Sequence, residues 1–195
     1  MNTDLIIGIS GNARSGKDTL CELAKQFLSD KEVPAARAAF ADQIKRDLDE
    51  LCRHKIGCSA FTSDSEEKEL IRPLLVAYGT DVIRKMNEDW WVEQLEKNLT
   101  LYRAQAIIPI ITDVRYPNEL EWMRTNHGVS IHVSRDGISP ANSEEEAHND
   151  FLEKEADYTV SWPTFGADNI QKGKGYITHV MEDIYKTKIE CKLQT

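Results

Sequence analysis

Short apolar runs alternate with amphipathic segments along the chain, a pattern typical of an α/β fold. The first run, Leu5 to Ile9, is nearly continuous, as expected for a strand buried on both faces of a parallel sheet. A Gly-rich turn follows, and from Lys17 apolar residues recur on one face of a helix. The pattern predicts a three-layer α/β/α fold around a five-stranded parallel sheet. The other predicted strands lie at about 35–40, 107–112, 129–133 and 158–161.

A long helical excursion separates the second and third predicted strands. Residues from about 66 to 103 carry helical periodicity, and we expect Pro73 to begin a new helix and Gly79 to interrupt it. We therefore predict one domain over residues 1–195, with a helical insertion at about 41–104.

Two later segments complete the pattern. A helix is expected near Asn118 to Asn126, closed by Gly128. Residues 135–152 combine Gly, Pro and Asn with an acidic run, so we expect a surface loop there, either a plain solvated loop or a lid that closes over a binding site.

The composition of the chain argues against some classes of function. The chain has 41% hydrophobic and 29% charged residues, an ordinary soluble globular composition. With 24 Lys+Arg against 33 Asp+Glu, the net charge of −9 opposes binding to nucleic acid. The longest apolar stretches fall far short of the roughly 20 residues that a membrane span needs. Since no basic region precedes the first apolar run, we expect a cytoplasmic protein.

The four cysteines show no paired CxxC spacing, and we expect them to be buried apolar residues. Cys52, His54 and Cys58 could supply three zinc ligands, but the sequence offers no evident fourth.

A phosphate-binding motif lies between the first strand and the first helix. The segment from Gly11 to Lys17 fits GxxxxGK, and its position after a buried strand and before a helix is the one that phosphate binding requires. Backbone N–H groups of such a loop surround a phosphate, and the lysine lies against the β and γ phosphates of a nucleotide. We predict that the nucleotide is bound by Gly11, Asn12, Ala13, Arg14, Ser15, Gly16, Lys17, Asp18 and Thr19.

The metal site departs from the general motif, because Asp18 stands where Ser or Thr normally binds magnesium and Thr19 comes one residue later. Asp18 could hold Mg²⁺, directly or through water, or only interact with the positive end of its helix. Asp113 follows the third predicted strand and is a second candidate ligand. Arg115, two residues later, favours phosphoryl chemistry at this edge of the sheet.

Several motifs follow the order found in one kinase family. The loop reads RSGKDT over residues 14–19, and FADQIK over 40–45 is similar to a FADPLK-like segment with Gln in place of Pro. LLVAYGTDVIR, ending at Arg84, resembles LQxLGTDxIR. DVRYPNE over 113–119 and IHVSR over 131–135 resemble DxR and IHVxR segments. The sequence thus resembles the deoxynucleoside monophosphate kinases of tailed bacteriophages, within the P-loop nucleoside monophosphate kinase-like group.

This resemblance implies transfer of the ATP γ-phosphoryl group to a deoxynucleoside 5′-monophosphate with Mg²⁺, which gives ADP and a deoxynucleoside diphosphate. It also implies that the helical insertion binds the acceptor, so we assign Lys45 and Arg84 to the acceptor phosphate and include Arg72. Trp90 and Trp91 point about 100° apart on a helix, so we expect one in the core and the other, taken as Trp90, against the base.

The remaining candidate residues are those that we expect to act in phosphoryl transfer. An acceptor phosphate is largely dianionic at pH 7 and needs no base, so such a kinase depends on cations. Arg115 and Arg135 could bridge donor and acceptor, and Asp113 and Arg115 could also contact the substrate. The predicted catalytic set is Lys17, Arg14, Asp113, Arg115 and Arg135.

Other readings stay open. A different P-loop kinase, acting on dephospho-coenzyme A or phosphomevalonate, would have similar loops. A nucleotide-binding switch or ATPase is the second alternative, although the sequence has neither an [NT]KxD element nor a DxxG switch after the third strand. The accepted bases, the tolerance of ribose and the oligomeric state, a homodimer included, are not set by the sequence.

Overall fold

The sheet of the computed structural model has five strands, all paired in parallel, in the order β2-β3-β1-β4-β5. The structure describes residues 4–140, 143–164 and 171–191. The predicted α/β fold with a five-stranded parallel sheet is therefore confirmed. The strands are β1 (Ile7–Ser10), β2 (Ala35–Ala38), β3 (Ile108–Val114), β4 (Val129–Arg135) and β5 (Tyr158–Trp162).

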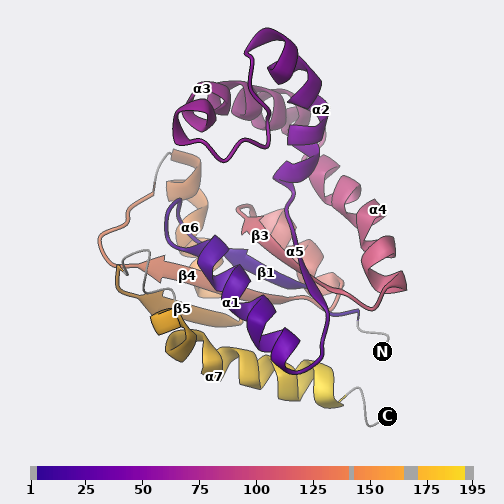
Figure 1. The fold of residues 1–195 in the computed structure, drawn as a ribbon, viewed down its shortest axis with the longest axis vertical. Helices are drawn as coiled ribbons and strands as arrows, with labels where there is room; N and C mark the ends of the chain where they lie inside the picture. Colours follow the sequence, from indigo (N-terminus) through magenta and orange to yellow (C-terminus); the bar gives the residue numbers. More distant parts are fainter. Residues whose placement is uncertain (1–3, 141–142, 165–170, 192–195) are drawn as a thin grey trace. The chain divides into compact units, whose positions relative to one another are not determined.

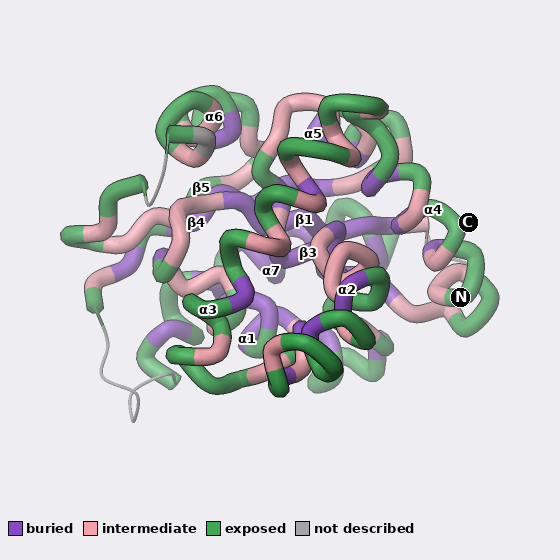
Figure 2. The backbone as a smooth tube through the Cα atoms, turned by 90° about the horizontal axis from the view of Figure 1, so that it is seen from above, coloured by how far each residue is buried: buried purple, intermediate pink, exposed green. Residues whose placement is uncertain are grey.

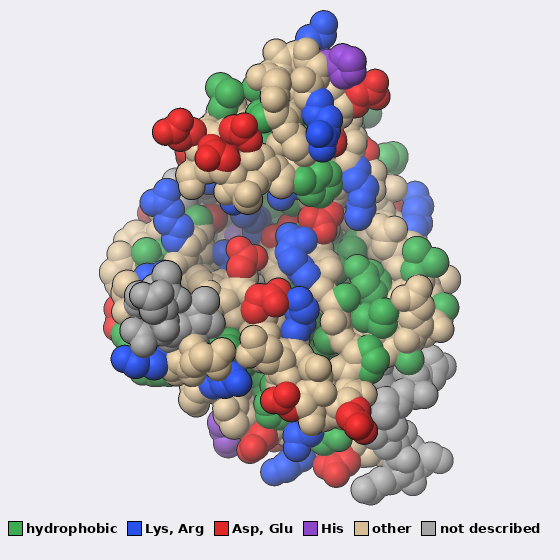
Figure 3. All heavy atoms as spheres, viewed as in Figure 1, with side chains coloured by type: hydrophobic (Ala, Val, Ile, Leu, Met, Phe, Trp, Pro, Cys, Tyr) green, Lys and Arg blue, Asp and Glu red, His purple; other side chains and the backbone are tan. Residues whose placement is uncertain are grey.

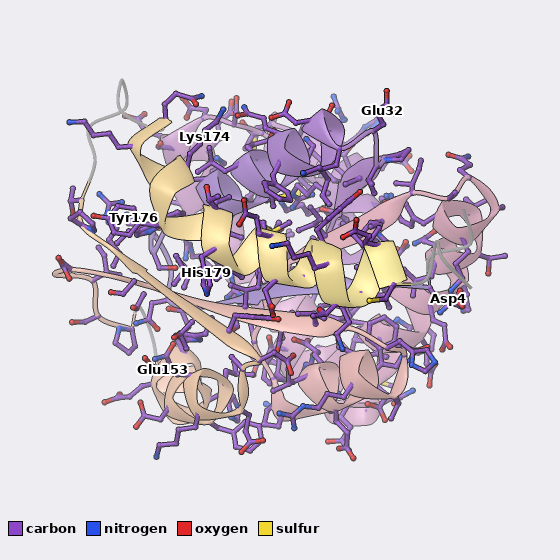
Figure 4. All side chains as sticks on the ribbon, turned by 90° about the horizontal axis from the view of Figure 1, so that it is seen from below. Asp4, Glu32, Glu153, Lys174, Tyr176 and His179 are labelled. Carbon is purple, nitrogen blue, oxygen red and sulfur yellow. The ribbon has the colours of Figure 1, made fainter. Side chains whose placement is uncertain are left out.

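Helices cover both faces of this sheet and give the three predicted layers (Figures 1 and 2). On one face lie α1 (Lys17–Asp30) and α7 (Lys174–Ile184), which continues as the π-helix η3 (Tyr185–Glu190). On the other face lie α5 (Pro117–Thr125) and α6 (Ser143–Glu155). Figure 4 shows Glu153 on α6, across the sheet from Tyr176 and His179 on α7.

The main core lies between the sheet and α1 and α7. All four residues of β1 are buried, as its continuous apolar run predicted. Figure 2 shows the central strands as the buried part of this layer. On the opposite face, a Cβ on Gly8 would come within 2.1 Å of the Met123 side chain, so a larger residue there would have to displace this side chain of α5.

The end of α5 corrects one prediction. The left-handed residue after this helix is His127, with φ 59°, and not Gly128. The N–H of His127 donates to the carbonyl of Arg124, and the N–H of Gly128 donates to that of Met123, which is the Schellman pattern. Gly128 is required for space instead, because a Cβ there would lie 2.7 Å from the Met123 carbonyl oxygen.

A second compact unit, Ala39–Asn98, has its own smaller core. The first unit comprises Met1–Ala38 and Leu99–Thr195. The Asp64 side chain accepts hydrogen bonds from the N–H groups of Glu66 and Glu67 and so begins α3. The helices of this part of the chain are α2 (Ala41–Lys55), α3 (Ser65–Val76), the π-helix η1 (Ala77–Arg84) and α4 (Trp90–Ala104).

Two helix breaks predicted in this unit are absent. Pro73 lies inside α3 rather than at a helix start, because the helix is held by the packing of the buried Ile71 and its neighbours against Leu48 and Cys52. Gly79 does not interrupt the helix but lies within η1, the π-helical stretch that follows. A Cβ on Gly79 would come 2.6 Å from the Ile44 side chain, so glycine permits close packing against α2.

Three of the cysteines are buried as expected, but Cys191 is exposed. Among the described residues, no helix is long and apolar enough to cross a membrane. Figure 3 shows acidic and basic side chains interspersed over the face of the first unit that carries α1, where Lys25 and Glu22 form an ion pair at 2.9 Å.

Candidate functional site

The predicted phosphate loop lies at the carboxyl end of the sheet, where parallel α/β proteins bind ligands. Residues 11–16 connect β1 to α1. Asp113 and Arg115 lie at the end of neighbouring β3, and Arg135 ends β4 on the other side of β1. The strand order therefore brings together predicted site residues that are about 100 residues apart in sequence.

The loop backbone needs its glycines. Gly11 and Gly16 have φ values of 133° and 101°, and Arg14 between them has φ 65°. A Cβ on Gly11 would lie 2.2 Å from the carbonyl oxygen of Val133 on β4, so a larger residue would push the loop off the sheet. The conformation curls the chain directly before the N-terminus of α1, the arrangement that binds anions.

Lys17 folds back over this loop. Its Nζ donates hydrogen bonds to the carbonyl oxygens of Gly11 and Asn12, at 2.6 and 2.7 Å. Burial, followed by the positive charge of Arg115, lowers the pKa of Lys17 to about 8, against the opposing effect of nearby carboxylates. Those carboxylates belong to Glu145, Asp18 and Asp113. The two predicted metal ligands, Asp18 and Asp113, therefore lie close enough to Lys17 to raise its pKa.

An internal carboxylate binds the loop. The Oε2 of Glu145 on α6 accepts a hydrogen bond from the N–H of Ala13 at 3.0 Å, and its Oε1 lies 3.6 Å from Arg115. The Glu145 side chain is only 8% exposed. The loop and Arg115 thus already hold an anion between them.

The prediction of a surface loop at 135–152 is wrong from residue 143 on, because residues 143–155 form α6. The closure of this segment as a lid stays a prediction. Glu145 and Glu146 lie in the first turn of this helix, where the helix dipole stabilises acidic residues. The acidic run therefore begins a helix and does not belong to a loop.

The chain beyond β3 is fixed by Glu119. This carboxylate is 2% exposed and accepts hydrogen bonds from the N–H groups of Arg115 and Tyr116, at 2.7 and 3.1 Å. It thereby caps α5 and holds the backbone from which the Arg115 side chain extends. The ring of Tyr116 in turn packs on His148 of α6, with ring centroids 5.3 Å apart.

Two side chains support the loop from the ends of β4 and β5. The indole Nε1–H of Trp162 donates to the carbonyl of Ser15 at 2.8 Å, and the Arg135 guanidinium donates to the carbonyl of Arg14 at 3.3 Å. Arg135 also donates to the Thr164 hydroxyl at 3.0 Å. Arg135, predicted to bridge two substrates, therefore contacts the loop backbone in this structure.

Beneath the loop, Ser10 at the end of β1 contacts a buried histidine. The Ser10 hydroxyl lies 3.0 Å from Nδ1 of His132, which is 2% exposed. Burial lowers the pKa of His132. A neutral imidazole therefore joins β1 to β4 at the point where the loop begins.

The predicted acceptor residues belong to the second unit. Lys45 on α2 is half-buried, with its amine 5.7 Å from the centre of the Phe61 ring. Arg72 is exposed and pairs with Glu69 on its own helix at 3.3 Å. Arg84 is half-buried at the end of η1.

The two adjacent tryptophans separate as expected. Trp91 is 2% exposed, donates its indole N–H to the carbonyl of Gly79 at 3.0 Å and packs against Tyr78. Trp90 is 40% exposed. Its stacking on a base stays a prediction.

Sequence reasoning missed three residues of this region: Trp162, Glu145 and Glu119. Only Glu119 had a local signal, since Pro117 followed by an acidic residue at the third helical position is typical of a helix start. Trp162 and Glu145 reach the loop through contacts between residues 147 and 132 positions apart, which no local pattern indicates.

Comparison with known proteins gives one family match. Residues 9–129 match the family model described as phosphomevalonate kinase. No curated protein is similar enough in sequence to count as a match. A solved structure of a mutant APS kinase CysC from Mycobacterium tuberculosis is 12% identical, with a TM-score of 0.45 over 93% of this chain and 99% of that one. The dephospho-CoA kinase from Campylobacter jejuni is 15% identical, with a TM-score of 0.46 over 92% of this chain and 98% of that one.

Proposed function

Because the chain belongs to the phosphomevalonate kinase family, matched over residues 9–129, we propose that it transfers the γ-phosphoryl group of ATP to a phosphate monoester. A deoxynucleoside 5′-monophosphate is our first candidate acceptor. The observation that carries the proposal is the anion already held at the loop: the Glu145 carboxylate bound by the Ala13 N–H and Arg115. A phosphate group of ATP, like this carboxylate, is an anion whose oxygens accept hydrogen bonds.

The residues present fit a nucleoside triphosphate. Among the described residues, the buried Ser15 hydroxyl in the loop has no hydrogen-bond partner and can donate to a phosphate oxygen. Lys17 has an amine that exchanges loop carbonyls for phosphate oxygens when a nucleotide binds. Loop N–H groups, the α1 N-terminus and Lys17 would together hold the β and γ phosphates.

Magnesium also fits the donor set. Mg²⁺ in nucleotide sites is bound by one or two carboxylates together with phosphate oxygens and waters. Asp18 and Asp113 would supply the carboxylates, directly or through water, with Thr19 as the alternative to Asp18. The bound ion would neutralise charge on the transferring phosphoryl group. Arg115, whose charge acts on Lys17, would place a second positive charge beside the transferring phosphoryl group.

On the acceptor side, the proposal uses the cations of the second unit. Lys45 and Arg84 are half-buried, which favours a strong interaction with a phosphate, and we assign them to the acceptor. Arg72 is an exposed helix-surface residue paired with Glu69, so it contributes least to the proposed site. Trp90, with 40% of its surface exposed, is available to stack on a base.

Phosphomevalonate is the second candidate acceptor, and the family match itself favours it. It is also a phosphate monoester, so the same donor chemistry serves both candidates. At the end away from its phosphate, phosphomevalonate carries a carboxylate, whereas a deoxynucleoside monophosphate carries a base. Dephospho-coenzyme A differs more, because a hydroxyl acceptor needs a carboxylate to receive its proton.

The test is ADP formation from Mg-ATP with each deoxynucleoside monophosphate, each ribonucleoside monophosphate, phosphomevalonate, dephospho-coenzyme A and no acceptor. We expect strong turnover with one or more deoxynucleotides and little without acceptor. Lys17→Met is the control, and it should abolish transfer while leaving the melting curve intact. Turnover with phosphomevalonate alone would replace the first candidate with the second, and rapid hydrolysis without acceptor would favour an ATPase.

A further inference from the structure

Side chains at the ends of two neighbouring strands, β4 and β5, donate hydrogen bonds to the phosphate loop. Trp162 donates to the Ser15 carbonyl and Arg135 to the Arg14 carbonyl, so two consecutive loop carbonyls are held. Arg135 and Trp162 are directly paired across β4 and β5. The end of this strand pair therefore supplies two hydrogen-bond donors that hold the loop backbone.

The indole of Trp162 is locked in place before any ligand binds. The residue is 3% exposed and belongs to the main core. A Cβ on Gly16 would come 2.7 Å from its ring, and one on Gly173 would come 3.6 Å from it and 2.8 Å from the Leu23 side chain. Glycines thus pack closely on the ring from the loop and from the segment before α7. Its N–H is a fixed donor.

The hydrogen bond to Ser15 sets the direction of a loop N–H. In a trans peptide the C=O and the following N–H point in opposite directions, and the described chain has no cis peptide bond. Because the Ser15 carbonyl points at Trp162, the N–H of Gly16 points away from Trp162. Gly16 directly precedes α1, where N–H groups bind phosphate.

We propose that Trp162 is a positioning residue for ATP: its indole N–H fixes the peptide between Ser15 and Gly16 so that the Gly16 N–H is aimed at a phosphate. This inference rests on the ATP binding contained in the proposed function. It assigns to Trp162 a role in ligand affinity in addition to its place in the core. A residue with only a packing role would affect stability alone.

Trp91 provides a matched control. Its indole is equally buried, at 2% exposed, and donates to a backbone carbonyl at 3.0 Å, but it lies in the second unit and contacts Gly79. Trp162→Phe and Trp91→Phe therefore remove the same group and leave similar cavities. Both variants should melt at lower temperatures than the wild type.

The experiment measures the affinity for Mg-AMPPNP by calorimetry at a temperature where all three proteins are folded. We expect Trp162→Phe to weaken binding about tenfold, the equivalent of one lost hydrogen bond. Trp91→Phe should stay within about twofold of the wild type. Wild-type affinity in Trp162→Phe, or equal weakening in both variants, would overturn the proposal.

A second measurement does not depend on the folding of Trp162→Phe. In the wild type labelled with ¹⁵N-tryptophan, the Trp162 indole signal should shift on addition of Mg-AMPPNP, because a phosphate on the Gly16 N–H polarises the peptide whose carbonyl accepts the indole hydrogen bond. The signal can be assigned from variants of the other tryptophans, and an unchanged signal overturns the proposal. Because AMPPNP binding needs no acceptor, a protein that binds it but phosphorylates no acceptor contradicts the proposed function and not this inference. A wild type that does not bind AMPPNP overturns both.

Discussion

Lys17 combines a hydrogen-bonded side-chain amine with a lowered pKa. Its amine is held by two loop carbonyls, and burial beside Arg115 brings its pKa to about 8. Near pH 8 about half of such amines are neutral. A bound polyphosphate favours the charged amine and so raises this pKa again.

We therefore predict that ATP binding takes up protons near pH 8, approaching about half a proton for each ATP bound. Calorimetry in two buffers with different ionisation enthalpies measures this uptake. In Lys17→Arg the guanidinium is charged at every pH used, so the uptake should disappear. Equal uptake in the wild type and in Lys17→Arg would show that another group titrates.

Helix α6 places Glu145 at the phosphate loop, because this residue lies in the first turn of the helix. A phosphate that binds the Ala13 N–H must displace this carboxylate, which has about the same hydrogen-bonding needs. Glu145 and ATP are therefore expected to compete.

Glu145→Ala should bind Mg-ATP more tightly, by roughly three- to tenfold, because no internal anion has to leave the loop. Equilibrium binding of ATP measures the change. Glu153→Ala is the matched control, since it removes the same charge from the same helix two turns later. Equal tightening in both variants would indicate a general charge effect instead of competition.

The end of α2 depends on another carboxylate. Asp49 accepts hydrogen bonds from the Ser59 hydroxyl, the Arg53 guanidinium and the Ala60 N–H, at 2.6, 2.8 and 2.8 Å. Hydrogen bonds from Ser59 and then Arg53 lower the pKa of Asp49 to about 2. The ionised carboxylate thus ties the irregular chain after α2 back to the helix.

A carboxyl group whose pKa is lowered by folding stabilises the protein above its unfolded pKa of about 3.9, and this contribution is lost as the pH falls through the folded pKa. Asp49→Asn should therefore lower the melting temperature at pH 7, and the gap from the wild type should close between about pH 4 and pH 2. Thermal melts across this range provide the test. A gap that persists at pH 2 would contradict the assignment.

For the whole molecule, the two compact units differ in the size of their cores. The first unit buries a large cluster that includes Ile7, Ile110 and Met181, whereas the second buries a small one around Leu48 and Ile71. Local stability follows the amount of buried apolar contact.

Hydrogen exchange should therefore proceed at different rates in the two units. We expect amides of β1 and β3 to exchange by global unfolding, and amides of α2 and α3 to exchange faster, through local opening of the second unit. Mass-spectrometric exchange under native conditions measures both sets at once. Equal protection in both would show that the units unfold as one.

The pattern of the sequence predicted most elements because their physical causes are local. A continuous apolar run and a 3.6-residue period arise within a few neighbouring residues, and they located the five strands and α1. The predictions failed where a tertiary contact outweighed a local preference. Pro73 stays inside a helix that packs on a core, and Glu145 belongs to the first turn of a helix that begins at the loop.

By itself, then, the sequence determined the parallel α/β fold and the phosphate loop with Lys17, since a strand, a glycine turn and a helix are consecutive in the chain. Only the tertiary structure decided which side chains hold that loop. Glu145 and Trp162 reach it because the order β2-β3-β1-β4-β5 places β4 next to β1 and β5 next to β4. Contacts between residues more than a hundred positions apart are set by strand order and packing, and local spacing carries no record of them.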